Sequence, residues 1–224
     1  MTAGVRLSIF DMDRTLTKGG SYSPWLLHWA WHEAPWRLLL LPLSLIAGGA
    51  YVLKLVSRGR LKEINHRLLM GARTDAARAA ARAESFAERV MLPRAFADAR
   101  ARIAAEQAEG RRVVIATASY GFYVRAIADR LGVADVVATG SVRDGAGAIL
   151  ARLDGENCYG AAKRAMVEAW LAREGIATTD MRFFSDHHSD APTFALASEA
   201  IAVNPTPKLA ALAAANNWRI ERWR

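Results

Sequence analysis

The chain has 224 residues, of which 52% are hydrophobic and 23% charged, and its formal net charge is +8. This length allows one substantial core with a smaller inserted module. The basic residues are mostly arginines spread along expected helices, with no compact patch interleaved with aromatic residues, so we expect an anionic substrate or surface and no nucleic acid.

Cysteine content and the N-terminal sequence favour a cytoplasmic protein. The single cysteine, Cys158, cannot form an internal disulfide, and no Cys/His cluster has zinc-ligand spacing. The N-terminus lacks a basic stretch followed by an apolar run and a small-residue cleavage site. We therefore expect a reducing compartment and no export signal.

Short apolar segments that end in polar residues recur along the chain and predict buried strands. They cover 5–10, 112–117, 135–138, 181–184 and 200–203. Helical patterns at 122–131 and 191–198 lie between some of them. This alternation predicts an α/β fold with a Rossmann-like, three-layer parallel sheet, whose ligands bind at the carboxyl ends of the strands.

The stretch from Lys18 to Glu109 has helical patterning and no convincing strand, and it is too long for a simple crossover connection. We predict an α-helical cap at 18–91, inserted into a catalytic core formed by 1–17 and 92–224. Within this stretch Thr74 is expected to cap a helix that runs toward Val90, and Pro93 to begin the next helix.

The first strand is followed by two carboxylates, Asp11 and Asp13, with Thr15 two residues further on. Side chains in extended backbone alternate with period two, so both carboxylates can face one space. Phosphoryl transfer needs a nucleophile, a proton donor and positive charge near the phosphate. Asp11 can be the nucleophile, and Asp13 can be the acid and then the base.

An acidic pair alone is as often a solvated turn, and three later features raise its significance. A hydroxyl, Thr117, follows the second strand, and Lys163 opens a later helix. A second acidic pair, Asp186 and Asp190, follows the fourth strand. Several carboxylates and a phosphate can share one cleft only with a lysine and a divalent cation, and hard oxygen ligands favour Mg²⁺.

This ordered set resembles the four motifs of the haloacid dehalogenase-like phosphatases over nearly the whole chain. The resemblance implies Mg²⁺-dependent hydrolysis of a phosphomonoester through an aspartyl-phosphate. It implies that Asp11 is the nucleophile, that Asp13 is the acid/base and that Thr15 supports this pair by hydrogen bonds. Thr117, Lys163 and Thr15 would bind the phosphate, and Asp11, Asp186 and the backbone carbonyl of Asp13 would bind the metal. Asp190 would hold Lys163 or a metal-bound water.

The position of the insert, the segment 158–163 and the loop 185–192 resemble the phosphoserine phosphatase-like subfamily, IB. The sequences at 18–21, 117–119 and 186–190 depart from the Glu, Ser-Gly-Gly and Gly-Asp-Gly-x-Asn-Asp patterns of phosphoserine phosphatases. Specificity for phosphoserine is therefore not indicated.

An apolar segment at 36–56 contains an uncharged run from Leu38 to Leu53, and several tryptophans precede it. It is shorter than the ~20 residues of a membrane span and is interrupted by Pro42. One crossing would also separate Asp11 from Lys163. Two alternatives remain: a helical hairpin that turns near Pro35 and contacts a membrane through 25–56, or a cap whose helices bury the run.

A similar apolar stretch occurs in the bacterial phosphatidylglycerophosphatases of this family. The resemblance implies a phospholipid phosphate as substrate and a peripheral or monotopic location at the inner membrane. The alternatives are a phosphatase of a soluble amino-acid or sugar phosphate, and, in another class, a membrane-associated regulatory protein that has this fold and little turnover.

Overall fold

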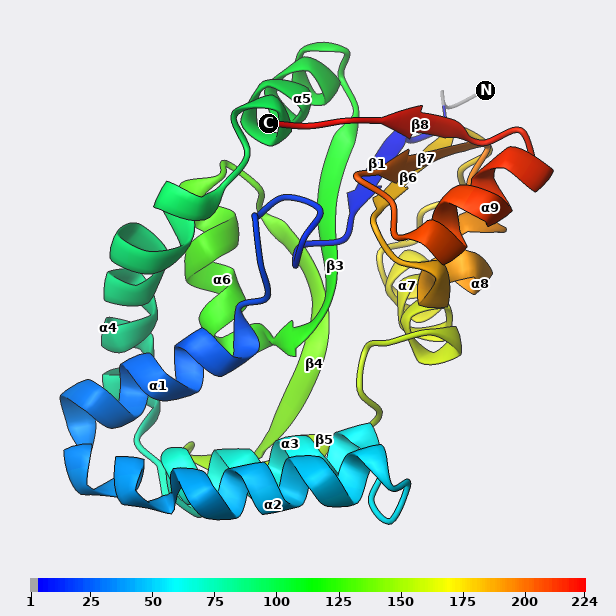
Figure 1. The fold of residues 1–224 in the computed structure, drawn as a ribbon. Helices are drawn as coiled ribbons and strands as arrows, with labels where there is room; N and C mark the ends of the chain where they lie inside the picture. Colours follow the sequence, from blue (N-terminus) through cyan, green and yellow to red (C-terminus); the bar gives the residue numbers. More distant parts are fainter. Residues whose placement is uncertain (1–3) are drawn as a thin grey trace.

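One mixed sheet organises the fold. The computed structural model describes residues 4–224, whose eight strands lie in the order β2-β5-β4-β3-β1-β6-β7-β8 (Figure 1). Their bounds are β1 (Leu7–Phe10), β2 (Arg73–Thr74), β3 (Arg112–Tyr120), β4 (Asp135–Arg143), β5 (Ile149–Asp154), β6 (Met181–Ser185), β7 (Glu199–Val203) and β8 (Arg219–Glu221). Neighbouring strands from β4 to β8 are parallel, whereas β5 is antiparallel to β4 and β2 to β5.

Strand β1 lies between β3 and β6, and its register places the ends of β1 and β6 beside the middle of β3, which continues to Tyr120. Phe10 pairs with Ile115 of β3 and with Phe184 of β6. The polar residues that follow these positions therefore meet at the carboxyl edge of the sheet, where parallel sheets bind ligands.

The strand residues alternate between two apolar layers, as period two requires. Leu7 and Ile9 pack in one layer, and Phe10 packs in the other. The first layer contains α7 (Ala161–Arg173), α8 (Ala191–Phe194) and α9 (Pro207–Ala215). The second contains α1 (Tyr22–Glu33), α4 (Ala76–Phe86), α5 (Ala97–Ala108) and α6 (Gly121–Arg130). Figure 1 shows α7 and α6 on opposite sides of β3, so the predicted α/β three-layer architecture is confirmed.

All five predicted strands are present, and β2, β5 and β8 were not predicted. The stretch between Lys18 and Glu109 therefore contains a strand, contrary to the prediction, but β2 has only two residues. Such a segment is too short for any periodic pattern to reveal.

Two helix starts were predicted wrongly. Thr74 does not cap α4, because it lies in β2; the cap is Asp75, whose side chain accepts a hydrogen bond from the Arg78 N–H at 2.7 Å. Pro93 lies in a separate 3₁₀ turn (Leu92–Arg94), and α5 begins only at Ala97, after Phe96 in extended conformation.

The chain reverses direction after α1, as the predicted hairpin near Pro35 requires (Figure 1). A 3₁₀ helix (Pro35–Leu40) leads into α2 (Leu41–Val52), which lies beside α3 (Arg58–Leu69). The stretch Pro35–Val52 is the one described helix that is long and apolar enough to cross a membrane, and only 6% of it is buried. Leu45 and Ile46 are 76% and 68% exposed. The alternative in which cap helices bury the apolar run is therefore wrong.

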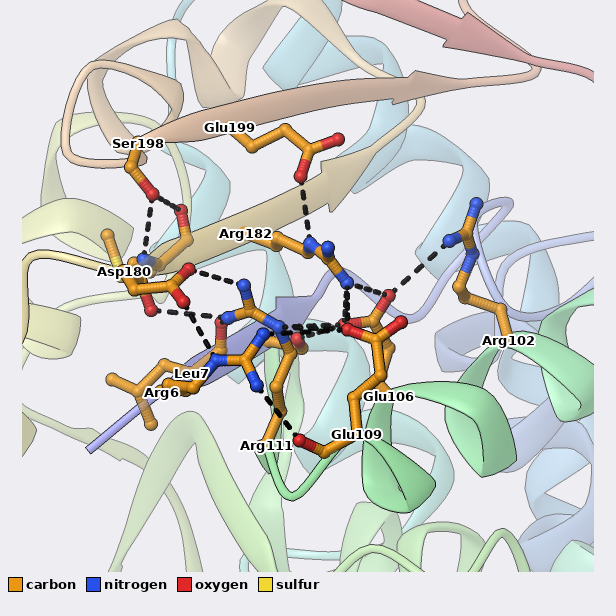
Figure 2. A network of polar contacts seen from close by, with 12 residues as sticks. Arg6, Leu7, Arg102, Glu106, Glu109, Arg111, Asp180, Arg182, Ser198 and Glu199 are labelled. Atoms are coloured by element: carbon orange, nitrogen blue, oxygen red, sulfur yellow. Dashed lines mark hydrogen bonds and ion pairs between the residues drawn. The ribbon is translucent and has the colours of Figure 1, made fainter. Parts of the chain in front are cut away.

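The amino end of the central strands carries a network of ion pairs (Figure 2). Glu106 of α5 is fully buried and accepts hydrogen bonds from Ser8 Oγ at 2.6 Å and from Arg182 Nη1 at 3.0 and 2.9 Å. Arg111 pairs with Asp180 and lies 3.4 Å from Glu106. Opposite charges are matched at this end of the sheet.

Candidate active site

Asp11 is the first residue after β1 and is buried at the carboxyl edge of the sheet. Its backbone N–H donates to the Phe184 carbonyl at 2.8 Å, which extends the pairing with β6 by one residue. Its Oδ1 accepts a hydrogen bond from Lys163 Nζ at 2.7 Å. The pKa of Asp11 is raised to about 7, mainly by burial; Lys163 opposes this shift, and Asp190 and Asp186 add to it.

Lys163 lies in the first turn of α7, after Gly160, whose φ of 61° suits a residue without Cβ. Its Nζ also donates to Asp190 Oδ2 at 2.7 Å. Burial lowers the pKa of Lys163, but Asp11 and Asp190 outweigh it, and the net shift is upward. The lysine therefore stays charged between two carboxylates.

Thr15 joins the first and fourth motifs. Its Oγ1 lies 3.2 Å from Asp11 Oδ2 and 3.4 Å from Asp186 Oδ1, and it accepts a hydrogen bond from the Asp186 N–H at 3.1 Å. Burial raises the pKa of Asp186 to about 6, with Asp190 adding to the shift. Two carboxylates that share one hydroxyl repel each other unless a cation lies near them.

The Asp13 carboxylate accepts hydrogen bonds from two serines. Its Oδ1 accepts from the Ser21 N–H and its Oδ2 from Ser119 Oγ, both at 2.9 Å. Burial raises the pKa of Asp13 above its ordinary value, and the bonds from Ser21 and Ser119 oppose that shift.

Six of the seven predicted residues line one cavity of about 250 Å³: Asp11, Asp13, Thr117, Lys163, Asp186 and Asp190. Thr15 is fully buried and hydrogen-bonded to Asp11. The Thr117 hydroxyl accepts a hydrogen bond from the Ser119 N–H at 3.1 Å. The structure thus brings together all the residues that the sequence selected.

The donor chemistry of this cavity fits Mg²⁺. Within residues 4–224 no three acidic, histidine or cysteine side chains form a metal cluster. Asp190 Oδ1 is buried and has no hydrogen-bond partner in that range. A buried, unpaired carboxylate oxygen next to Asp11 and Asp186 is an acceptor to which a hydrated cation can donate through its water.

Sequence reasoning did not select the other six residues that line the cavity: Arg14, Arg58, Ala118, Tyr159, His187 and Ser189. The Arg58 guanidinium lies 3.9 Å from the centre of the Tyr159 ring. A second cavity, of about 240 Å³, shares Asp13 and Arg58 with the first and is also lined by Tyr51 of α2. Nothing local in the sequence marks Arg58, because the insert brings it to the core from far along the chain.

Comparison with known proteins agrees with this geometry. The family model of haloacid dehalogenase-like hydrolases matches residues 9–195. Phosphoserine phosphatase SerB1 of Mycobacterium tuberculosis is 33% identical over 116 residues, which are 51% of this chain and 37% of that protein. A putative hydrolase of Mycobacterium leprae is 32% identical over 116 residues, which are 51% of this chain and 38% of that protein. The chain thus matches well under half the length of these relatives.

Solved structures extend the likeness to the whole chain. A protein of unknown function from Bordetella pertussis Tohama I has a TM-score of 0.86 and 26% identity, and the match covers 97% of this chain and 98% of that one. A phospho-aspartyl intermediate analogue of phosphoserine phosphatase has a TM-score of 0.63 and 18% identity, with 97% and 93% covered. At that identity the second likeness concerns the fold alone.

Proposed function

Because the chain belongs to the haloacid dehalogenase-like hydrolase family, we propose that it is a Mg²⁺-dependent phosphatase that cleaves phosphomonoesters through an aspartyl-phosphate on Asp11. One observation carries this proposal. A buried carboxylate at a strand end is held by Lys163 and Thr15, and a second carboxylate, Asp13, lines the same cavity.

In the first step an oxygen of Asp11 attacks phosphorus, and the bond from phosphorus to the leaving oxygen breaks. Asp13 transfers its proton to that oxygen. Lys163 and Thr117 hold the phosphate oxygens, and Lys163 also keeps Asp11 in place. When bound, Mg²⁺ offsets the negative charge that the phosphate and the carboxylates bring together.

In the second step a water attacks the phosphorus of the aspartyl-phosphate and gives its proton to Asp13. The bond between phosphorus and Asp11 breaks, which releases phosphate and restores the carboxylate. Asp190 supports both steps because it accepts a second hydrogen bond from Lys163.

Replacing Asp11 by Asn tests the mechanism. Mg²⁺-dependent release of phosphate from p-nitrophenyl phosphate should fall by at least about 10³-fold, because an amide is a poor nucleophile. Asp129→Asn, at an exposed position of α6, is the control and should keep the wild-type rate. Retained turnover by Asp11→Asn would contradict the nucleophile. A wild-type protein inactive on a broad set of phosphates would support the regulatory alternative.

We also propose that 18–91 acts as a cap over a core formed by 1–17 and 92–224. Tyr22, Leu61 and Lys62, all from this segment, line the second cavity beside Asp13. The leaving group of a substrate with its phosphate at Asp11 would enter that cavity. Residues of the cap would then select the substrate.

The surface of α2 favours a lipid phosphate as that substrate, and this is our proposal for the substrate class. Leu45, Ile46 and Val52 are exposed on α2, while Tyr51 of the same helix lines the second cavity. A contiguous exposed apolar surface is typical of a membrane contact. The basic Lys54 and Arg60 are exposed beside it and suit anionic headgroups, so we propose a peripheral location at a membrane.

A comparison of substrates tests this. The protein should hydrolyse phosphatidic acid in mixed micelles faster than soluble sugar or amino-acid phosphates, and it should sediment with anionic vesicles. The double variant Leu45→Gln/Ile46→Gln should lose sedimentation and lipid turnover while keeping the rate on p-nitrophenyl phosphate. Ile220→Gln, an exposed apolar position on β8, is the control. Faster turnover of the soluble phosphates would favour the soluble-metabolite alternative.

A further inference from the structure

Three buried hydroxyl groups stand behind the Asp13 carboxylate. Ser119 Oγ donates to Asp13 Oδ2 at 2.9 Å. Ser21 Oγ lies 2.8 Å from Ser119 Oγ and 3.1 Å from the Tyr123 hydroxyl. These three side chains are at most 1% exposed. These hydroxyls have almost no contact with solvent, so each group needs its partners within the protein.

The hydrogen atoms in this chain can run in only one order. Ser119 has a single hydroxyl hydrogen and gives it to Asp13, so it must accept from Ser21. Ser21 then has no hydrogen left for Tyr123 and must accept from it. The order is Tyr123 to Ser21 to Ser119 to Asp13. Each bond polarises the next, which strengthens the last one.

Ser21 contributes in a second way. It is the N-cap residue of α1, a position where a serine normally accepts a hydrogen bond from its own helix, yet its side chain makes no such bond in the described structure. Its hydroxyl serves the chain instead, and its backbone N–H donates to Asp13 Oδ1 at 2.9 Å.

The far end of the chain is fixed by the aromatic core of the insert. The Tyr123 ring stacks on Trp25 at 4.9 Å between centroids and meets Phe86 edge-on at 5.8 Å. Trp25 lies on α1 and Phe86 on α4. Packing in the insert thereby sets the position of the tyrosine hydroxyl and, through two serines, that of the Asp13 carboxylate.

We propose that Ser119, Ser21 and Tyr123 are positioning residues that hold the Asp13 carboxylate so that it can protonate the leaving oxygen. The donors occupy one side of each carboxylate oxygen, and Asp13 lines both cavities with the remainder. The inference rests on the proposed phosphatase reaction. It adds that the insert controls the proton donor as well as the substrate.

The test compares leaving groups. A nitrophenolate departs without a proton, whereas an alkoxide needs one. In the first step, which kcat/KM reports, a misplaced acid therefore slows only the second kind of substrate. For Ser119→Ala we expect kcat/KM for β-glycerophosphate to fall on the order of 10–100-fold, within the 10²–10⁴-fold range of general acid catalysis. For p-nitrophenyl phosphate the fall should be less than about threefold. Ser119→Thr, which retains a hydroxyl, should restore most of the alkyl-phosphate rate.

Tyr123→Phe provides an independent variant, because it removes only the hydroxyl at the far end of the chain. It should change the ratio of the two rates in the same direction by roughly 2–5-fold. Ser8→Ala removes an equally buried serine at the opposite end of β1 and should leave that ratio unchanged. Asp13→Asn removes the acid itself and sets the largest change in the ratio that any of these variants can reach.

Two outcomes would overturn the inference. One is an equal loss on both substrates in Ser119→Ala and in Tyr123→Phe, which is the result of general structural damage. The other is wild-type behaviour of both variants. A wild type inactive on both substrates would instead refute the proposed function, so the two failures are distinguishable.

Discussion

The charges at the two ends of β1, a strand of only four residues, are balanced in different ways. At the amino end, Glu106 is buried among Ser8, Arg111 and Arg182 (Figure 2). At the carboxyl end, Asp11, Asp13, Asp186 and Asp190 line one cavity with Lys163 as the buried cation. The first cluster neutralises itself, and the second carries an excess of negative charge.

The pKa shifts follow this division. At the amino end a hydrogen bond from Arg6 leads the lowering of the Asp180 pKa. At the carboxyl end burial leads the raising of the pKa of Asp11 to about 7 and of Asp186 to about 6. Buried ion pairs alone therefore do not mark a catalytic site. A carboxylate excess with an unpaired oxygen, as on Asp190, marks a candidate site because it needs a cation to balance it.

Removing Glu106 tests the structural assignment of the amino end. Glu106→Gln should lower the free energy of unfolding by about 3–5 kcal/mol, because Arg111 and Arg182 lose a buried partner. The rate per folded molecule should not change. Urea unfolding and kcat on p-nitrophenyl phosphate measure the two effects. Glu168→Gln breaks the exposed pair with Arg164 and should cost less than about 0.5 kcal/mol. A large loss of kcat in Glu106→Gln would show that the cluster at the amino end of β1 also affects catalysis, contrary to its structural assignment.

His66 differs from the charged residues at both ends of β1, because it is a buried titratable group without a hydrogen-bond partner among the described residues. Neither ring nitrogen has a hydrogen-bond partner among residues 4–224, and burial lowers its pKa from 6.5 to about 4. The unfolded chain therefore binds a proton that the folded protein excludes. The stability from neutral His66 is present above pH 6.5 and is lost as the pH falls toward 4.

Between pH 7 and pH 5 this loss should amount to about 2 kcal/mol. The difference in the free energy of unfolding between the two pH values should shrink by that amount in His66→Leu. His32→Gln, at an exposed position of α1, is the control and should behave like the wild type. An identical pH dependence in His66→Leu and wild type would exclude His66 as the cause.

A divalent cation should stabilise the protein through the carboxylates at the carboxyl end of β1 and not through the ion pairs at its amino end. Mg²⁺ at ten times its dissociation constant should raise the free energy of unfolding by about 1.4 kcal/mol. Asp186→Asn should abolish this increase, whereas Glu106→Gln should retain it from its lower starting point. Thermal melts with EDTA and with Mg²⁺ measure the difference. An equal response of both variants would show that the cation does not bind at the predicted residues.

The predictable part of the fold was local. Segments such as 112–117 carry a largely apolar run, so five of the eight described strands and six cavity-lining residues followed from the sequence. The predicted end of the second strand was wrong, because β3 continues through Thr117 to Tyr120. Helix starts were less predictable. Thr74 and Asp75 are adjacent and both suit an N-cap, and only the pairing of Thr74 with Ile149 in the sheet decides between them.

The sequence by itself determined that Asp11, Lys163 and Asp186 meet, because strand ends and helix starts are encoded by neighbouring residues and parallel strands align them at one edge. Only the tertiary structure decided which way Asp13 points, since Ser119 comes from 106 residues away. It also decided that Arg58 enters the cavity and that α2 exposes its leucines. Those outcomes depend on how the insert packs on the core, and no local pattern specifies that packing.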